Sequence, residues 1–208
     1  MKTKKIYLIR HGETDYNKQR IVQGSGVDSD LNELGRAQAS AFFEYYKHIP
    51  FDKVYTSALK RTIQSVQKFL DAGLPHEAYA GLNEINWGKK EGRRVVPEED
   101  VAYYELLQKW KNGQVDIPIE GGESPVQVLE RQKPVLDLIL SRTEEKTILI
   151  STHGRAMRIL LCLMLNYPLK EMDRFEHENL CLYILYYTGS LFTVEKFSDT
   201  EHLQSLTN

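Results

Sequence analysis

The chain has 208 residues, of which 41% are hydrophobic and 27% charged, so we expect it to fold around a sizeable core. A formal charge of −2, from 27 basic and 29 acidic residues, argues against a nucleic-acid-binding protein that works by bulk charge. The two cysteines are too few for a disulfide framework or a zinc cluster and fit a reducing, cytoplasmic compartment. No apolar run approaches the roughly 18 residues of a membrane-spanning helix, so no membrane association is expected.

The first half of the chain alternates short apolar runs with helical patterns, which is typical of a parallel sheet covered by helices. Residues 6–9 predict a buried strand, and Asn32 predicts the N-cap of a helix that ends near residue 47. A second strand is predicted at 52–56 and a weak third strand at 76–80. Ser57 is the predicted N-cap of the helix between them, whose apolar face is formed by Leu59, Ile63, Val66 and Leu70.

A segment near the middle of the chain interrupts this alternation. Residues 86–123 combine mixed charge, two tryptophans and short helical patterns. We interpret them as a cap-like insertion within a single domain that spans residues 1–208. A helix follows, because Ser124 is a good N-cap, Pro125 suits the first helical position and Gln127 completes a capping box.

The last third of the chain returns to the α/β pattern. Residues 147–152 predict a strong strand, and 155–165 a helix that is apolar on most sides and therefore deeply packed. Residues 180–187 and 191–197 predict a closing hairpin around Gly189. The whole pattern predicts an α/β fold with a mainly parallel sheet.

Charged side chains and histidines follow four of the predicted strands. Ligands of open α/β sheets bind beyond the carboxyl ends of the strands, so these side chains are expected to meet at one edge. Taken singly, a histidine there is usually a hydrogen-bonded structural residue, and an arginine or glutamate is usually solvated. Their shared place is what predicts a site, and the five are Arg10, His11, Arg61, Glu84 and His153.

Two arginines and two imidazoles would form a cationic pocket suited to phosphate oxygens. A histidine can attack phosphorus and carry the phosphoryl group, and a glutamate can protonate the leaving oxygen. No metal-ligand spacing appears, so the protein itself would neutralise the charge. Other chemistries fit less well, because the chain has no Walker A loop, dinucleotide fingerprint or nucleophile elbow. Cys162 and Cys181 lie in apolar segments and predict core packing rather than nucleophiles.

Short motifs occur in a fixed order along essentially the whole chain. They are Leu8-Ile-Arg10-His11-Gly12-Glu13-Thr14 with Asn17, Arg20, Gln23 and Gly24, then Leu31-Asn-Glu-Leu-Gly35-Arg-Ala-Gln38-Ala, Ser57-Ala-Leu-Lys-Arg61-Thr62, Leu82-Asn-Glu84, Gly121-Gly-Glu-Ser124 and His153-Gly154. The set resembles the histidine phosphatase superfamily, which includes the cofactor-dependent phosphoglycerate mutases. Arg-His-Gly alone is a weak motif, but the ordered set is specific. The resemblance implies a three-layer α/β/α sandwich, with a mostly parallel sheet and helices on both faces.

The resemblance also implies a role for each matching residue. His11 would be the nucleophile that becomes phosphohistidine, and Glu84 the general acid that later activates water. Three side chains would hold the phosphoryl oxygens, namely Arg10, Arg61 and His153. Four further positions are expected to bind substrate, namely Asn17, Gln23, Gly24 and Gly154. No metal or other cofactor is implied.

The segment after Glu84 bears on the reaction type. Trp87-Gly88-Lys-Lys-Glu91-Gly92 is similar to the Phe/Trp-Gly-x-x-Glu-Gly pattern of the phosphatase branch. The mutase branch usually has an Arg-His-Tyr-Gly-type run there and a longer insertion. We therefore expect a metal-independent phosphatase acting on a small-molecule phosphate monoester. A bisphosphate-dependent phosphoglycerate mutase is the alternative, and a non-catalytic phospho-ligand-binding protein is a third.

Several features have two interpretations. A basic cluster formed by Lys89, Lys90, Arg93 and Arg94 could hold a second anionic group, or be a solvated surface offset by Glu98, Glu99 and Asp100. The aromatic side chains of the insertion could stack on substrate, or pack the insertion onto the sheet; they are Trp87, Tyr103, Tyr104 and Trp110. Asp30 stands where the family often has proline. The natural substrate, a homodimer formed through the terminal hairpin, and the order of the tail at 200–208 are left undecided.

Overall fold

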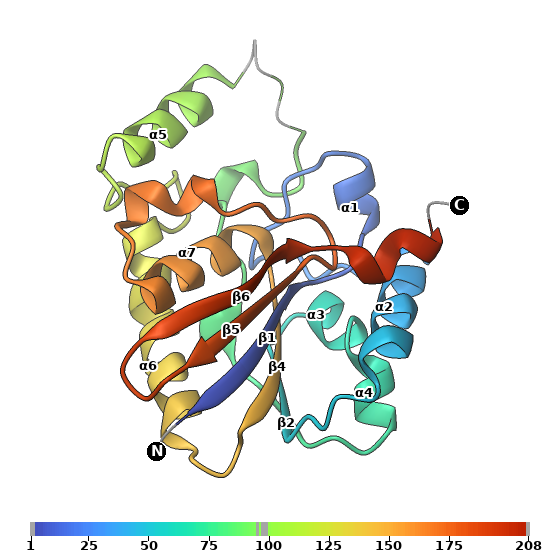
Figure 1. The fold of residues 1–208 in the computed structure, drawn as a ribbon. Coiled ribbons are helices and arrows are strands. Elements are labelled where there is room, and N and C mark those ends of the chain that lie inside the picture. The colour runs from blue at the N-terminus through green and yellow to red at the C-terminus, as the bar shows by residue number, and fades with distance from the viewer. Residues whose placement is uncertain (1–2, 95, 97–99, 207–208) are drawn as a thin grey trace.

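A six-stranded sheet runs through the middle of the molecule in the order β3-β2-β4-β1-β5-β6 (Figure 1). The computed structural model describes residues 3–94, 96 and 100–206. Its strands are β1 (Lys4–Arg10), β2 (Lys53–Thr56), β3 (His76–Ala78), β4 (Thr147–Thr152), β5 (Leu182–Tyr187) and β6 (Phe192–Asp199). The first four are parallel to one another, whereas β5 is antiparallel to β1 and β6 to β5. The expected mostly parallel sheet is confirmed.

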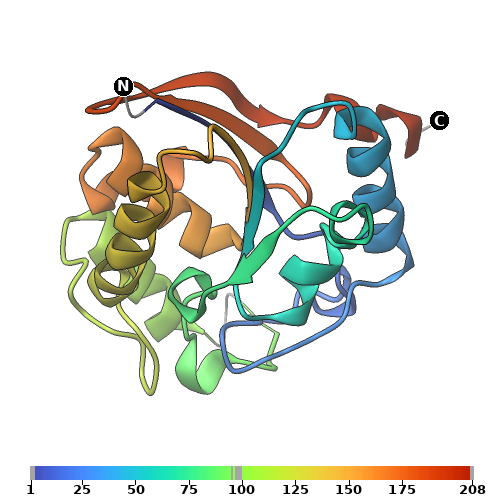
Figure 2. The same ribbon diagram turned by 90° about the horizontal axis from the view of Figure 1, so that it is seen from below.

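Helices cover both faces of this sheet, as Figure 2 shows along its edge. On one face lie α2 (Glu33–Tyr46), α3 (Lys60–Gln64) and α4 (Gln67–Asp71), and on the other α6 (Pro125–Ser141) and α7 (Gly154–Leu165). A short helix, α1 (Asp15–Lys18), follows β1. The three-layer sandwich implied by the family resemblance is therefore present.

The central strand β1 divides the core into two halves. Ile6 and Leu8 pack into the cluster under α6 and α7, and Tyr7 and Ile9 pack into the cluster under α2 and α4. This alternation is the period of two that a strand imposes on its side chains. Burying each aliphatic side chain contributes about 1.5–3 kcal/mol. The strand that ends at the histidine predicted as nucleophile is thus fixed from both sides.

Two of the predicted helix N-termini are confirmed in detail. The Asn32 side chain accepts a hydrogen bond of 2.8 Å from the Gly35 amide at the start of α2. Ser124 and Gln127 form the predicted capping box at the start of α6. Both helices begin where local side-chain chemistry alone places them.

The helical region after β2 differs from the prediction. Leu59, not Ser57, is the N-cap of α3, and the region is split into α3 and α4 at Ser65 and Val66. The Ser57 hydroxyl accepts from the Leu59 amide at 3.1 Å and lies 2.8 Å from His153 Nε2, so it links the start of this region to the site. The predicted apolar face holds only in part, because Leu59 and Val66 are buried while Ile63 and Leu70 are only half-buried.

A 3-10 turn, η1 (Ala80–Leu82), precedes the inserted segment. The described residues of this segment form a second 3-10 turn, η2 (Gly88–Lys90), and the helix α5 (Val101–Lys111). The α5 helix contacts η3 (Leu169–Arg174), which follows α7 (Figure 1). Trp110 of α5 is 1% exposed and donates a hydrogen bond to the Ile117 carbonyl. Trp110 thus packs the insertion onto the body of the protein. The division into one domain with a cap-like insertion stays a prediction.

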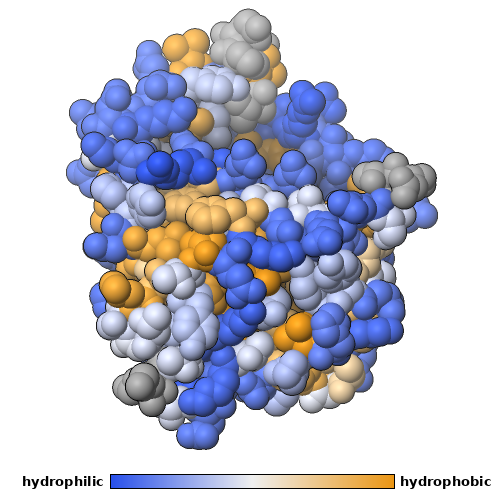
Figure 3. Space-filling model, viewed as in Figure 1, coloured by the Kyte–Doolittle hydropathy of each residue, from blue (hydrophilic) through white to orange (hydrophobic). Residues whose placement is uncertain are grey.

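The C-terminal segments follow the predicted hairpin. Strands β5 and β6 pair antiparallel, and η4 (Glu201–Leu206) then packs on α2, with His202 buried between them. Figure 3 shows apolar side chains gathered over β5, β6 and α7, where Leu191 and Phe197 are exposed. A homodimer through this edge stays a prediction. Within the described residues, no helix has the length and apolar character needed to cross a membrane.

Candidate active site

The predicted residues converge at the carboxyl ends of three neighbouring strands. In the sheet register Arg10 lies opposite Thr152, and Ser151 lies opposite Thr56, so β1, β2 and β4 end level with one another. The rings of the two histidines that follow β1 and β4 are 5.2 Å apart. A cavity of about 230 Å³ lies here, and it is lined by Arg10, His11, Asn17, Ile21, Val22, Gln23, Glu84, Trp87, Tyr103, Gly154, Arg155 and His177.

His11 is held as a neutral imidazole. Its side chain is buried, and its Nδ1 lies 2.7 Å from the Gly12 carbonyl oxygen. A carbonyl only accepts, so Nδ1 carries the proton and Nε2 keeps its lone pair. Burial, and then the charges of Arg61 and Arg10, hold the pKa of His11 well below its ordinary value. The imidazole can therefore attack an electrophile without first losing a proton.

This state of His11 predicts a spectroscopic result. At pH 6, where an ordinary histidine with a pKa of about 6.5 is mostly protonated, His11 is expected to remain neutral with its proton on Nδ1. Nitrogen-15 chemical shifts of selectively labelled histidine distinguish this tautomer from imidazolium. An imidazolium signal for His11 at pH 6 would contradict the assignment.

Two buried arginines supply positive charge beside His11. Arg10 donates from Nη1 to the His177 carbonyl at 2.6 Å, and its buried Nε has no partner among the described residues. Arg61 is fully buried, and burial lowers its pKa to about 10. Its three hydrogen bonds go to neutral groups, the carbonyls of Val27 and Gly24 and the ring of His153. Neither charge is neutralised by these bonds, so the pocket favours an anion.

His153 orients Arg61 in this structure. Its Nδ1 accepts a 3.1 Å hydrogen bond from Arg61 Nε, so its Nε2 carries the proton and donates to Ser57. Both ring nitrogens are thus engaged with the protein. A direct bond from His153 to a phosphoryl oxygen stays a prediction.

Asn17 is oriented for donation to a ligand. Its Oδ1 accepts from the amide and hydroxyl of Thr14 and from Asn179 Nδ2. Only its Nδ2 end can therefore donate to a bound phosphate. Gln23, in contrast, uses both ends of its amide within the protein, on Thr14 and Ser29.

Gly24 is the point where two segments meet too closely for a side chain. A Cβ there would lie 2.1 Å from Glu91 Oε1 and 2.5 Å from the Ile85 carbonyl oxygen. Glu91 also accepts from the Trp87 amide at 3.0 Å. The glutamate of the phosphatase-type motif therefore ties the insertion to the loop whose carbonyl holds Arg61.

Glu84 lies at the N-terminus of α7, where Gly154 is the first residue. Its Oε1 accepts from the amides of Ile85 and Ala156 at 2.9 and 2.8 Å, and its Oε2 from the Arg155 amide at 3.1 Å. Helix N-termini bind carboxylates in this way. Oε2 has one long hydrogen bond and is the oxygen better placed to exchange a proton with a ligand.

Arg131 of α6 fixes the segment that carries this acid. It donates to the carbonyls of Gly81, Asn83 and Glu84 at 2.8–3.0 Å and forms a bidentate pair with Glu123. Bidentate pairs of this kind restrict geometry as well as adding energy. Arg131 thus holds the segment that carries Glu84, and no sequence pattern pointed to it.

Replacing Arg131 with methionine is expected to lower turnover of esters with poor leaving groups by about 10²-fold, because a shift of about 1 Å in an acid has that effect. Esters with good leaving groups should lose less. The ratio of kcat for the two kinds of ester measures this, and equal losses on both would contradict a positioning role.

Two more residues were missed, His177, which lines the cavity, and Asn179, which donates to the His11 carbonyl and to Asn17 Oδ1. His177 and Asn179 belong to the segment before β5, which the family motifs do not cover. His177 Nδ1 lies 3.2 Å from Arg10 Nη1, and burial with the nearby Arg10 charge lowers the pKa of His177 to about 3. Only their position could have predicted them. A strand that runs antiparallel to β1 begins at the end where β1 stops, so the residues just before β5 lie beside the site.

The basic cluster does not form part of the cavity wall. Lys89 pairs with Glu120, and Lys90 pairs with Asp100. None of the four basic side chains lines the cavity, which favours the solvated-surface interpretation. The predicted partners Glu98 and Glu99 lie outside the described residues. Across the described part of the chain, no group of three or more His, Cys, Asp or Glu side chains is arranged to hold a metal ion.

Comparison with known proteins decides the family. The model for the histidine phosphatase superfamily (branch 1) matches residues 6–200. The chain belongs to this superfamily. It is also 31% identical over 207 residues to the probable phosphoglycerate mutase GpmB of Yersinia pestis, covering 95% of this chain and 94% of the relative.

Solved structures of histidine phosphatases share this fold. YhfR of Bacillus stearothermophilus is 27% identical with a TM-score of 0.84, covering 97% of this chain and all of the other. A phosphoserine phosphatase from Entamoeba histolytica, solved with 3-phosphoglyceric acid, is 25% identical with a TM-score of 0.81, covering 96% and 99%. The superfamily supports phosphatase or mutase activity, and the choice between them depends on the site.

Proposed function

We propose that the protein is a metal-independent phosphatase that hydrolyses a small-molecule phosphate monoester through a phosphohistidine at His11. The observation that carries this proposal is the neutral His11, with two guanidinium groups nearby that no carboxylate among the described residues pairs with directly. A dianionic phosphoryl group bound there would satisfy the buried Nε of Arg10. Attack by a neutral imidazole on phosphorus is the chemistry that this arrangement favours.

In the first step, His11 Nε2 forms a bond to phosphorus while the bond from phosphorus to the ester oxygen breaks. Glu84 Oε2 gives its proton to that oxygen, so an alcohol leaves instead of an alkoxide. Arg10, Arg61 and Asn17 stabilise the charge on the three equatorial oxygens. The Gly12 carbonyl accepts from Nδ1–H and stabilises the positive charge that develops on the ring.

In the second step, water attacks phosphorus and the bond to Nε2 breaks. Glu84 takes the proton from the water, which returns the carboxyl group to its starting state. Phosphate then leaves, and His11 is again neutral. The same carboxyl group acts as acid and then as base, so no further titratable group is needed.

Two features favour hydrolysis over transfer to a second substrate. The insertion is short, and its Glu91 packs against the loop at Gly24 and accepts from the Gly26 amide. A related enzyme of similar fold is named a phosphoserine phosphatase. Both cysteines are buried and unpaired, which agrees with the reducing, cytoplasmic location that we infer from the sequence.

A phosphoglycerate mutase is the second candidate, since a relative at 31% identity carries the name probable phosphoglycerate mutase. A mutase would interconvert 3-phosphoglycerate and 2-phosphoglycerate and would be stimulated by 2,3-bisphosphoglycerate. A nuclear magnetic resonance assay of 3-phosphoglycerate with and without the bisphosphate separates the two activities.

The proposal is tested by measuring phosphate release from a panel of phosphate monoesters with chelator present. We expect release from a related group of esters by the native protein and none by the His11→Ala variant. If no ester releases phosphate and 2,3-bisphosphoglycerate stimulates mutase activity, the protein is a mutase and not a phosphatase. No activity of either kind would favour a phospho-ligand-binding role.

A further inference from the structure

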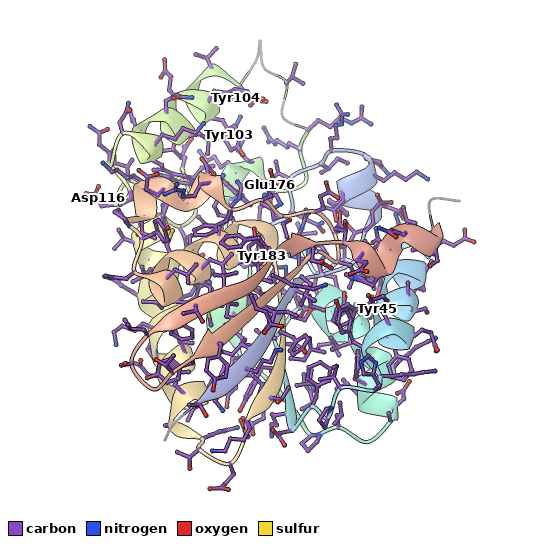
Figure 4. The ribbon with its side chains drawn as sticks, viewed as in Figure 1. Tyr45, Tyr103, Tyr104, Asp116, Glu176 and Tyr183 are labelled. Carbon is purple, nitrogen blue, oxygen red and sulfur yellow. The ribbon has the colours of Figure 1, made fainter. Side chains whose placement is uncertain are left out.

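Seven cavity-lining side chains take no part in the proposed phosphoryl chemistry, and they are Ile21, Val22, Gln23, Trp87, Tyr103, Arg155 and His177. Four of them are apolar or aromatic. Trp87 is buried, and its ring centroid lies 5.7 Å from that of Tyr103. Figure 4 shows Tyr103 on α5, nearer to the body of the molecule than its neighbour Tyr104. The insertion therefore contributes an aromatic surface to the cavity.

His177 adds a hydrogen-bond donor without a charge. Its Nδ1 faces the Nη1 donor of Arg10, so that nitrogen accepts and the proton lies on Nε2. With Arg10 beside it, the ring remains neutral. A ligand hydroxyl or ether oxygen could accept from this Nε2–H, whereas the ring offers no ion pair to a carboxylate.

Arg155 carries a charge, but its position is fixed. Its guanidinium pairs with Asp173 and lies 5.8 Å from the ring centroids of both Trp87 and Trp110. Asp173 also pairs with Arg158, which donates from Nε to the Phe175 carbonyl. Asp173 lies closer to Arg155 than to Arg158, at 2.5 against 2.8 Å, so the Arg155 charge is paired and is not free for a ligand.

The charges around the cavity match one phosphate group and no more. Glu84 gives up a proton in the first step of the proposed reaction, so it is neutral when the ester binds. Among the described residues Arg10 and Arg61 form no ion pair, whereas Arg155 pairs with Asp173. This leaves two positive charges, the number that a phosphate monoester dianion neutralises. A second anionic group on the substrate would be enclosed in a small cavity without a free counter-charge, which is unfavourable.

We propose that the leaving group of the substrate is uncharged and lies against Trp87 and Tyr103. The substrate class is then phosphate monoesters of small neutral alcohols or phenols with an aromatic or aliphatic body. His177 can donate a hydrogen bond from Nε2–H to a hydroxyl oxygen of such a group. This inference rests on the proposed phosphatase function, because it concerns the leaving-group end of the same cavity.

The first test compares two esters of matched size, 4-(hydroxymethyl)phenyl phosphate and 4-carboxyphenyl phosphate. The proposal predicts a kcat/KM about tenfold or more higher for the neutral ester, since an unpaired charge in a buried site costs at least that much. Equal values, or a preference for the carboxylate, would overturn it.

The second test changes the protein. Asp173→Asn removes one negative charge, so the cavity gains a counter-charge for a carboxylate. The ratio of kcat/KM for the carboxylate ester to that for the neutral ester should rise about tenfold. An unchanged ratio in a folded variant would contradict the charge balance. Both esters are measured on the same variant, so a general loss of activity lowers both kcat/KM values and leaves their ratio unchanged.

The aromatic surface has a matched control on the same helix. Tyr103→Ala should lower kcat/KM for phenyl phosphate about tenfold, mainly through KM, and should leave methyl phosphate nearly unchanged. Tyr104→Ala, one residue along α5 and 39% exposed, should change neither ester. Equal effects of the two substitutions would show that Tyr103 does not contribute to binding the leaving group.

Binding distinguishes a failure of this inference from a failure of the phosphatase function. If no ester is turned over, calorimetry with phenylphosphonate and 4-carboxyphenylphosphonate still compares neutral and charged groups in the same cavity. Tighter binding of phenylphosphonate supports the neutral subsite even without hydrolysis. Tighter binding of the carboxylate rejects the subsite, whatever the activity.

Discussion

Replacing His11 with alanine is expected to lower phosphate release by about 10⁴-fold or more, because the substitution removes the atom that bonds to phosphorus. The measurement is kcat for the best ester found for the native protein. His11 sits at the end of the central strand and its Nε2 is the only atom of the side chain left for a ligand, since Nδ1 is bonded to the Gly12 carbonyl.

The matched control is His48→Ala, because His48 is exposed and lies after α2, away from the cavity lining. It should keep the native rate. Thermal unfolding of both variants establishes that each is folded. A folded His11→Ala protein that retained more than about one hundredth of the native kcat would contradict covalent catalysis at this residue.

Replacing Glu84 with glutamine is expected to lower kcat for alkyl esters by about 10²–10⁴-fold, the usual contribution of a general acid. A 4-nitrophenyl ester should lose much less in the first step, because nitrophenolate leaves without a proton. The second step still needs a base, so the variant should release nitrophenol in a burst and then turn over slowly. Burst amplitude and steady-state rate measure the two steps separately.

Glutamine fits this position with little disturbance, since its carbonyl can accept the bonds now made to Oε1 by Ile85 and Ala156. Only the 3.1 Å bond from the Arg155 amide to Oε2 is lost. Glu144→Gln, at an exposed site between α6 and β4, serves as the control and should have no effect. Equal losses on alkyl and nitrophenyl esters, without a burst, would reject the acid and base roles of Glu84.

Much of the fold could be predicted because local signals were strong. The strand at 147–152 has the same bounds in the structure as in the prediction, since an uninterrupted apolar run is bounded by polar residues. Asn32 and Ser124 cap their helices through side-chain bonds that depend only on neighbouring residues. The site followed from the strand ends, because parallel strands bring them to one edge.

The failures have a common physical cause in long-range contacts. Ser57 is a good N-cap by composition, yet its hydroxyl bonds His153, which lies 96 residues away. Arg131 looks like a solvated helix residue, but it holds three carbonyls of the segment that carries Glu84. His177 reaches the cavity only because β5 pairs with β1. No local sequence pattern predicts partners that lie so far away in the chain.

The roles of the aromatic residues in the insertion could be predicted only as a pair of alternatives. The sequence left open whether they pack or bind, and the structure divides the roles among them. Trp110 is buried and packs the insertion, whereas Trp87 and Tyr103 line the cavity and Tyr104 is exposed. Composition alone could not separate neighbouring tyrosines that lie on different sides of one helix.

The most direct test of the account is to trap the phosphorylated enzyme. The Glu84→Gln variant is mixed with 4-nitrophenyl phosphate and quenched in alkali, in which phosphohistidine survives, and its peptides are analysed by mass spectrometry. Covalent catalysis at His11 predicts a phosphoryl group on His11 that is lost in acid and whose amount matches the nitrophenol burst. Turnover with no phosphoryl group on His11, or with one on another residue, would contradict it.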